Sequence, residues 1–172
     1  MPYPLNRNHF FLFFVAAAVL MCLCGASCLF AGDGKSSSGS AQLVVQTADG
    51  KTVLTRDFPR GSSFGIRFIH SVAKTPVIDW FSAPDGTLQL DKTVYQDFGA
   101  GLPHRPEAGQ TMRVSDGHIV ISGYDMPLPS FDVRVGRVAH HTLLLPEAWE
   151  EIPLDTLASP GAALTFTVKT AQ

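Results

Sequence analysis

A histidine and a serine end a predicted β-strand, and their types make them the first candidates for chemistry. The stretch "GIRFIHSVAKTPVIDWF" places His70 and Ser71 there, with Lys74 and Asp79 shortly after them. Neighbouring residues on a strand point to opposite faces, so His70 and Ser71 do not form a catalytic dyad. His70 continues an apolar face, and two interpretations stay open. It is either a histidine hydrogen-bonded to backbone, buried or at the rim of the core, or it lines the mouth of a binding cleft together with its charged neighbours.

A glycine-rich loop, "FGAGLPHRPEAG", is the second candidate. The residues proposed for binding in it are Gly99, Gly101, Pro103, His104 and Arg105. Backbone amides around the two glycines, with the cationic side chains nearby, can receive a carboxylate. No helix pattern follows the loop, and a glycine loop that is not set between a strand and a helix is weak evidence for a phosphate cradle. The structural alternative is a tight corner that crosses the end of a sandwich.

Other kinds of chemistry find little support. The histidines are not at metal-ligand spacing, and the neighbouring His70 and Ser71 diverge on their strand, so we expect no metal site, no cofactor and no enzymatic activity. Glu150 and Glu151 lie in the helical-looking stretch "PEAWEEIPLDTLAS", where we expect a solvated face. A formal net charge of −2 gives no broad attraction to phosphate backbones, which argues against nucleic-acid binding.

The N-terminus, residues 1–32, predicts an export segment. Its apolar run from Phe10 to Gly32 carries no charge and follows Arg7, and it is about as long as the roughly 20 residues that span a bilayer. Three interpretations stay open: an uncleaved anchor, a peptide cleaved after Ser27 or Ala31, and a lipoprotein acylated at Cys28. Each places the remaining chain on the periplasmic side of the inner membrane, anchored or lipidated, or free in the periplasm or secreted after cleavage.

The elements that must position the candidates are strands. After a Gly/Ser-rich linker at 33–40, residues 41–172 form short apolar runs separated by turn residues, including Asp49-Gly50 and Asp116-Gly117. All three cysteines lie in the export segment, so this domain has no disulfide. The pattern predicts an all-β domain, an antiparallel β-sandwich or barrel-like arrangement of about nine or ten short strands, with one short helical segment near 147–158.

Three segments in order, "RFIHSVAKTPVIDWF", "YQDFGAGLP" and "MPLPSFDVRVGRVAHHTLLL", resemble the pattern of a bacterial family, the domain of unknown function eighteen-fifty. The resemblance runs from about residue 64 to residue 145. It implies a small exported protein associated with tripartite transporters of the TRAP class that use TAXI-type solute receptors. From it we expect a non-enzymatic envelope accessory module that docks on the permease or the solute receptor. The alternative is a stand-alone periplasmic protein that binds a small molecule or an ion at the same face.

Overall fold

The computed structural model describes residues 41–99 and 101–170. The predicted export segment, the linker at 33–40 and Cys28 lie outside these residues. Within the described part of the chain, no helix has the length and apolar character needed to cross a membrane.

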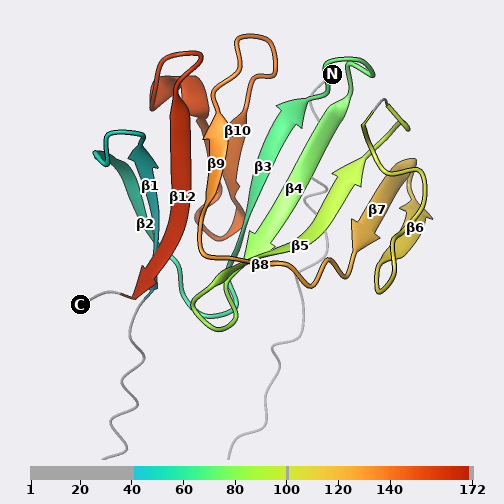
Figure 1. The fold of residues 1–172 in the computed structure, drawn as a ribbon, viewed down its shortest axis with the longest axis horizontal. Coiled ribbons are helices and arrows are strands. Elements are labelled where there is room, and N and C mark those ends of the chain that lie inside the picture. The colour runs from blue at the N-terminus through green and yellow to red at the C-terminus, as the bar shows by residue number, and fades with distance from the viewer. Residues whose placement is uncertain (1–40, 100, 171–172) are drawn as a thin grey trace, which may run out of the picture. The chain divides into compact units, whose positions relative to one another are not determined.

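Two antiparallel sheets make up the domain (Figure 1). The smaller sheet has four strands, in the order β2 (Thr52–Asp57), β1 (Ala41–Thr47), β12 (Ala163–Thr170) and β9 (Phe131–Arg134). The larger sheet has eight. Its main path runs β11 (Glu150–Pro153), β10 (Thr142–Leu145), β3 (Ser63–Ile69), β4 (Pro76–Ser82), β5 (Leu88–Tyr95), β7 (His118–Ser122) and β6 (Thr111–Ser115), and β8 (Pro127–Leu128) pairs with β5. The all-β antiparallel sandwich is therefore confirmed, with twelve strands in the described residues.

The segment expected to be helical near 147–158 contains a strand. Two single 3₁₀ turns, Pro146–Ala148 and Leu154–Thr156, flank β11. Along β11 the half-buried Glu150 and Ile152 alternate with exposed residues, which is the two-residue period of a strand. A four-residue strand is too short to stand out in sequence from the turns on either side of it.

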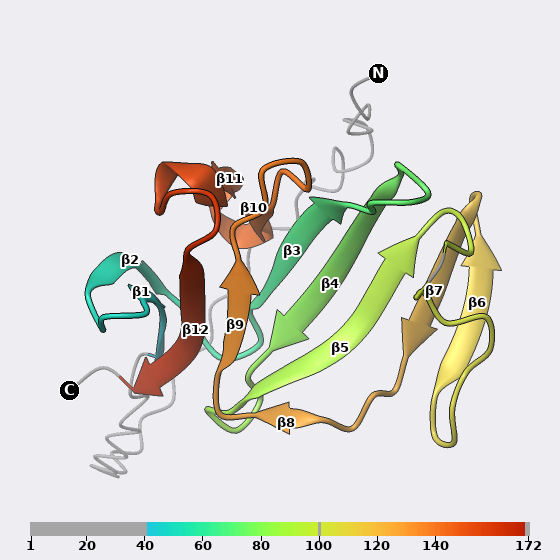
Figure 2. The ribbon, with the colours of Figure 1, turned by 45° about the horizontal axis from the view of Figure 1, so that its top comes forward.

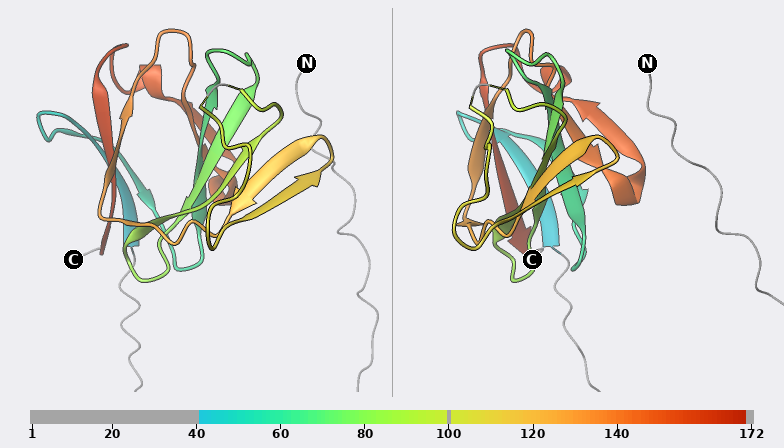
Figure 3. Two further views of the ribbon diagram at one scale, coloured as in Figure 1. Left: turned by 45° about the vertical axis from the view of Figure 1, so that its right-hand side comes forward. Right: turned by 90° about the vertical axis from the view of Figure 1, so that its right-hand side faces the viewer.

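Aromatic rings fill the space between the two sheets. Phe64, which is completely buried on β3, lies at the centre of this cluster. Its ring centroid is 5.8 Å from that of Phe58, 5.3 Å from Phe81, 6.2 Å from Phe131 and 6.1 Å from Phe166. Figure 3 shows strands of the two sheets facing one another across the sandwich. These contacts hold the smaller sheet against β3 and β4.

The remainder of the larger sheet has its own core. Val77, Tyr95, Ile119 and Ile121 are buried together on β4, β5 and β7, and Leu102 from the loop after β5 packs against them. In Figure 2 these strands continue away from β12 towards the β6–β7 hairpin. The loop after β5 is thus held against the sheet by apolar packing.

Glu150 is half-buried and Glu151 is exposed, and each forms an ion pair with an arginine of another strand. Arg56 on β2 donates two hydrogen bonds to Glu150 on β11, at 2.9 and 2.7 Å, so this pair connects the smaller sheet to the larger one. The guanidinium of Arg56 holds the pKa of Glu150 below its usual value. Glu151 points to the other face of β11 and pairs with Arg67 at 2.7 Å. Both carboxylates therefore have cationic partners.

Candidate functional site

His70 organises the turn between β3 and β4. Its Nδ1 accepts the backbone N–H of Val72 at 3.3 Å and of Ala73 at 3.1 Å, so the neutral ring carries its proton on Nε2. The backbone N–H of His70 donates to the carbonyl of Thr75 at 2.9 Å, and its carbonyl accepts the N–H of Lys74, whose φ of 57° is in the left-handed region. The interpretation of a histidine hydrogen-bonded to backbone is therefore the one that these contacts show. Both Ser71 and Lys74 are exposed beside it.

The glycine-rich loop packs directly on this histidine. Gly99 is buried, and a Cβ built on it would lie 2.8 and 2.9 Å from two atoms of the His70 ring and 3.2 Å from the Cβ of Ala73. Only glycine fits such an approach. The amide of Gly99 donates to the carbonyl of Asp97 at 2.8 Å, so this amide is not available to a carboxylate ligand. Gly101 turns the loop with a φ of +88°. The structure thus brings together two stretches that the sequence analysis singled out separately.

The rest of the glycine-rich loop is held on one side by a hydrogen bond from β5 and is exposed on the other side. The Tyr95 hydroxyl donates to the carbonyl of Pro103 at 2.6 Å. The His104 ring stacks on Phe98, with centroids 5.4 Å apart, and Arg105 is exposed. The outer side of this part of the loop carries exposed aromatic and cationic groups.

A third loop at the same end, residues 135–141 between β9 and β10, was not among the predicted binding residues. Its Ala139 carbonyl accepts the backbone N–H of Ile69 at 2.7 Å, which places it beside the His70 turn. The His141 ring lies against Phe68 at 5.7 Å, and its Nδ1 accepts the N–H of Gly136 at 3.2 Å. Burial lowers the pKa of His141. In the sequence, the only indication of this loop as a binding surface is the pair Arg137 and Val138 in a turn. An arginine next to a valine does not by itself indicate a site.

These three loops present exposed apolar side chains with cations close to them in the sequence. Val72 is 63% exposed, Val138 72% and Phe98 49%. We call this region the loop-end surface and define it by six exposed residues: Val72, Lys74, Phe98, Arg105, Arg137 and Val138. The turn after β3 and the loop between β9 and β10 lie at the same end of the sandwich in Figure 1. Neither of these two segments contains an acidic residue, whereas the glycine-rich loop after β5 contains Asp97 and Glu107.

Asp79 does not belong to this surface. It pairs with Ile66 on the inner face of the larger sheet, four residues along β3 from His70, or about 13 Å. The Thr93 hydroxyl donates to its carboxylate at 2.6 Å. Burial raises the pKa of Asp79, and the hydrogen bond from Thr93 only partly opposes that effect. The charge expected beside His70 is instead a partly buried acid within the sandwich.

Replacing Asp79 by asparagine is expected to stabilise the domain at neutral pH. Folding raises the pKa of Asp79 above its ordinary value of 3.8. The unfolding free energy of the wild-type protein therefore falls as the pH rises from 3.8 through the folded-state pKa. Asparagine cannot ionise and keeps an oxygen for Thr93. In urea titrations of the full-length protein, the advantage of Asp79→Asn should therefore grow between pH 4 and pH 7.

The exposed Asp85→Asn is the matched control, and the contribution of His141 cancels because both proteins contain it. A stability difference between Asp79→Asn and wild type that does not change with pH would contradict this assignment.

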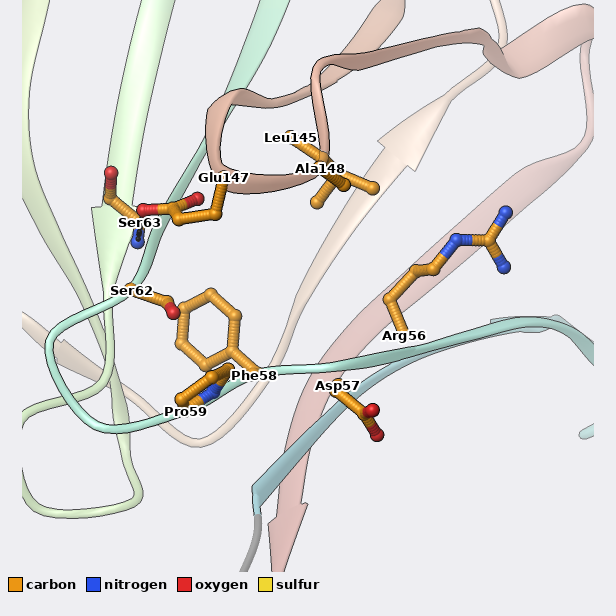
Figure 4. A pocket seen from close by; sticks show the side chains of 9 residues that line it. All are labelled: Arg56, Asp57, Phe58, Pro59, Ser62, Ser63, Leu145, Glu147 and Ala148. Carbon is orange, nitrogen blue, oxygen red and sulfur yellow. Dashed lines mark hydrogen bonds between the residues drawn. The ribbon is translucent and has the colours of Figure 1, made fainter.

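A pocket with a volume of about 250 Å³ opens at the other end of β3 (Figure 4). It lies between β2, the connection from β2 to β3 and the first 3₁₀ turn. Phe58, Pro59, Leu145 and Ala148 line it with carbon, and Asp57 and Glu147 add carboxylates. No sequence pattern indicated it, because its walls come from segments far apart in the chain.

A single exposed tryptophan follows the pocket in sequence. Trp149, next to the lining residue Ala148, is 84% exposed and has a φ of 53°. A bulky residue in the left-handed region is strained, and such strain collects at functional positions.

Among the described residues, no three histidine, aspartate or glutamate side chains gather closely enough to hold a metal ion.

A family model described as "Domain of unknown function (DUF1850)" matches residues 64–152, just over half of the 172-residue chain. The chain belongs to this family. The DUF1850 match extends from β3 into β11, so it contains all three loops of the loop-end surface and three pocket residues, Leu145, Glu147 and Ala148. The strands β1, β2 and β12 of the smaller sheet lie outside the DUF1850 match. No curated protein and no solved structure matches the chain.

Proposed function

We propose that this protein is a non-enzymatic accessory module of the bacterial envelope, and that its loop-end surface docks on a component of a membrane transporter. The observation that carries the proposal is the exposure of Val72, Phe98 and Val138 on neighbouring loops. Exposed apolar side chains grouped on a soluble domain mark interaction sites, whereas isolated ones do not.

The cations of the loop-end surface support a partner whose docking region is acidic around an apolar centre. Lys74, Arg105 and Arg137 are exposed near the apolar side chains. Protein interfaces commonly place apolar groups at the centre and charged groups at the rim, where the charges guide the encounter and select the partner. Association should therefore weaken as the salt concentration rises.

The finer assignment of the partner rests on the family resemblance. The resemblance implies an association with TRAP-class transporters that use TAXI-type receptors, so the proposed partner is the permease or the solute receptor of such a system. The predicted N-terminal anchor supports this proposal, since attachment to the same membrane raises the effective concentration of the two partners. A ligand cleft at this end has less support because the Gly99–His70 contact fills the space between two of the loops.

Site-specific photocrosslinking tests the proposal in native membranes. A photoreactive amino acid at position 72 of the full-length protein should capture a multi-span permease or a periplasmic solute receptor, identified by mass spectrometry. The same amino acid at position 114 is the matched control, because Val114 is 71% exposed but lies on the edge strand β6. Capture of the same proteins from both positions, or of no transporter component from position 72, would overturn the proposal.

A further inference from the structure

We propose that the pocket beside Phe58 binds an alkylammonium group, which is a protonated amine on a short aliphatic stem. The proposal concerns a different part of the domain from the loop-end surface. Ser63 of the pocket begins β3 and Ile69 ends it, so the two regions are separated by about 20 Å along this strand. The amine-binding pocket and the docking of the loop-end surface can therefore be tested, and rejected, independently of each other.

The size of the pocket restricts its ligand. Its volume of about 250 Å³ is below the range of about 300 to 1,000 Å³ that is usual for sites holding drug-sized molecules or cofactors. A nucleotide or a flavin is too large. A group the size of one amino-acid side chain fits.

The carbon-rich wall explains the aliphatic stem. Phe58 and Leu145 are buried at the base, and Pro59 and the exposed Ala148 continue the wall towards solvent. In Figure 4 the Phe58 ring lies below Leu145 and Ala148. A chain of methylene groups entering here exchanges water for carbon contacts, which is favourable in proportion to the area covered.

The charges beside this wall favour a cation. Glu147 contributes a carboxylate, which lies above the Phe58 ring beside Ser63 in Figure 4, whereas the carboxylate of the other acidic lining residue, Asp57, points away from the ring. Arg56, the cation among the lining residues, is already engaged through two hydrogen bonds with Glu150. Arg60 lies in the same connection and is exposed, but it does not line the pocket. The carboxylate of Glu147 is therefore the charge that lies beside the carbon-rich wall without a cationic side chain paired to it among the lining residues.

Glu147 is held in place to receive such a group. One of its oxygens, Oε1, accepts the backbone N–H of Ser63 at 3.2 Å, which ties the 3₁₀ turn to the start of β3. The other oxygen has no hydrogen bond within the described residues. A charge-assisted hydrogen bond from an ammonium group to this oxygen completes its coordination.

Isothermal titration calorimetry of the full-length protein in detergent tests the proposal, with n-butylamine as the probe and 1-butanol as its neutral counterpart. For a ligand this small a Kd of about 1 mM is expected for the amine, with markedly weaker binding of the alcohol. Nα-acetyl-lysine amide distinguishes the two sources of the group. Binding of both amines points to a lysine side chain of a partner, and binding of n-butylamine alone points to a free small amine.

Two variants separate binding from folding. Glu147→Gln keeps an oxygen for Ser63 and removes the charge, and it should weaken amine binding about tenfold. Ala148→Leu fills the pocket from an exposed position and should abolish binding. Glu151→Gln changes a glutamate of β11 that does not line the pocket, and this control variant should bind the amine as the wild-type protein does. Absence of saturable binding at ten times the expected Kd, equal binding of amine and alcohol, or unchanged binding in both pocket variants would overturn the proposal.

Discussion

Replacing Val72 and Val138 together by aspartate is expected to reduce association with the transporter component at least about 100-fold. Burying a valine side chain contributes about 1.5 to 3 kcal/mol, and both valines are more than 60% exposed in the free domain. Aspartate removes this contribution and leaves a charge to be desolvated in the interface. Each single variant should lose about tenfold. The measurement is quantitative recovery of the partner with the tagged full-length protein from native membranes.

The fold should not change in this double variant. Both valines lie in exposed turns, where substitutions usually change the unfolding free energy by less than about 0.5 kcal/mol. Val114→Asp makes the same chemical change on the exposed edge strand β6 and should leave association intact. Full recovery of the partner with the double variant would exclude these valines from the interface. Equal losses with Val114→Asp would show that the effect is not specific to the loop-end surface.

Replacing Phe64 by alanine is expected to lower the unfolding free energy by about 3 to 5 kcal/mol. Phe64 is completely inaccessible, and its ring lies against aromatic rings from both sheets. Removing it leaves a cavity between the sheets and takes away the contacts that hold them together. Because domains of this kind are stable by about 5 to 15 kcal/mol, the variant loses a large part of its stability.

Urea-induced unfolding of the full-length protein, followed by near-ultraviolet circular dichroism, measures this loss. Phe98→Ala is the matched control, since Phe98 is 49% exposed and its replacement should cost less than about 1 kcal/mol. If Phe64→Ala and Phe98→Ala were equally destabilising, the aromatic cluster would not be the centre of the core.

The strand pattern and the turns of this domain were predictable because they depend on neighbours in sequence. Alternation of apolar and polar residues and the Asp-Gly dipeptides follow from backbone geometry over a few residues. The hairpins around Asp49-Gly50 and Asp116-Gly117 are present as β1–β2 and β6–β7. Strand β11 escaped prediction because its four residues lie between two 3₁₀ turns and are stabilised by pairing with β10.

The candidate residues show where local reasoning ends. His70 and Gly99 were singled out for their types, and the structure places one against the other. Asp79 was assigned to the same surface because it is close in sequence, yet strand geometry carries it to the interior beside Thr93. Distance along the chain is a poor guide to distance in a sheet, since each residue of a strand adds about 3.4 Å.

By itself, the sequence determined the all-β class, the two Asp-Gly hairpins and the family of this protein. The tertiary structure alone decided which loops meet, as at the hydrogen bond from Ile69 to Ala139, and which residues enclose the pocket beside Phe58. The reason is physical. Strand formation follows from local backbone sterics and side-chain alternation, whereas the contacts between loops and between sheets are set by long-range pairing and packing, which a single sequence does not encode in its local pattern.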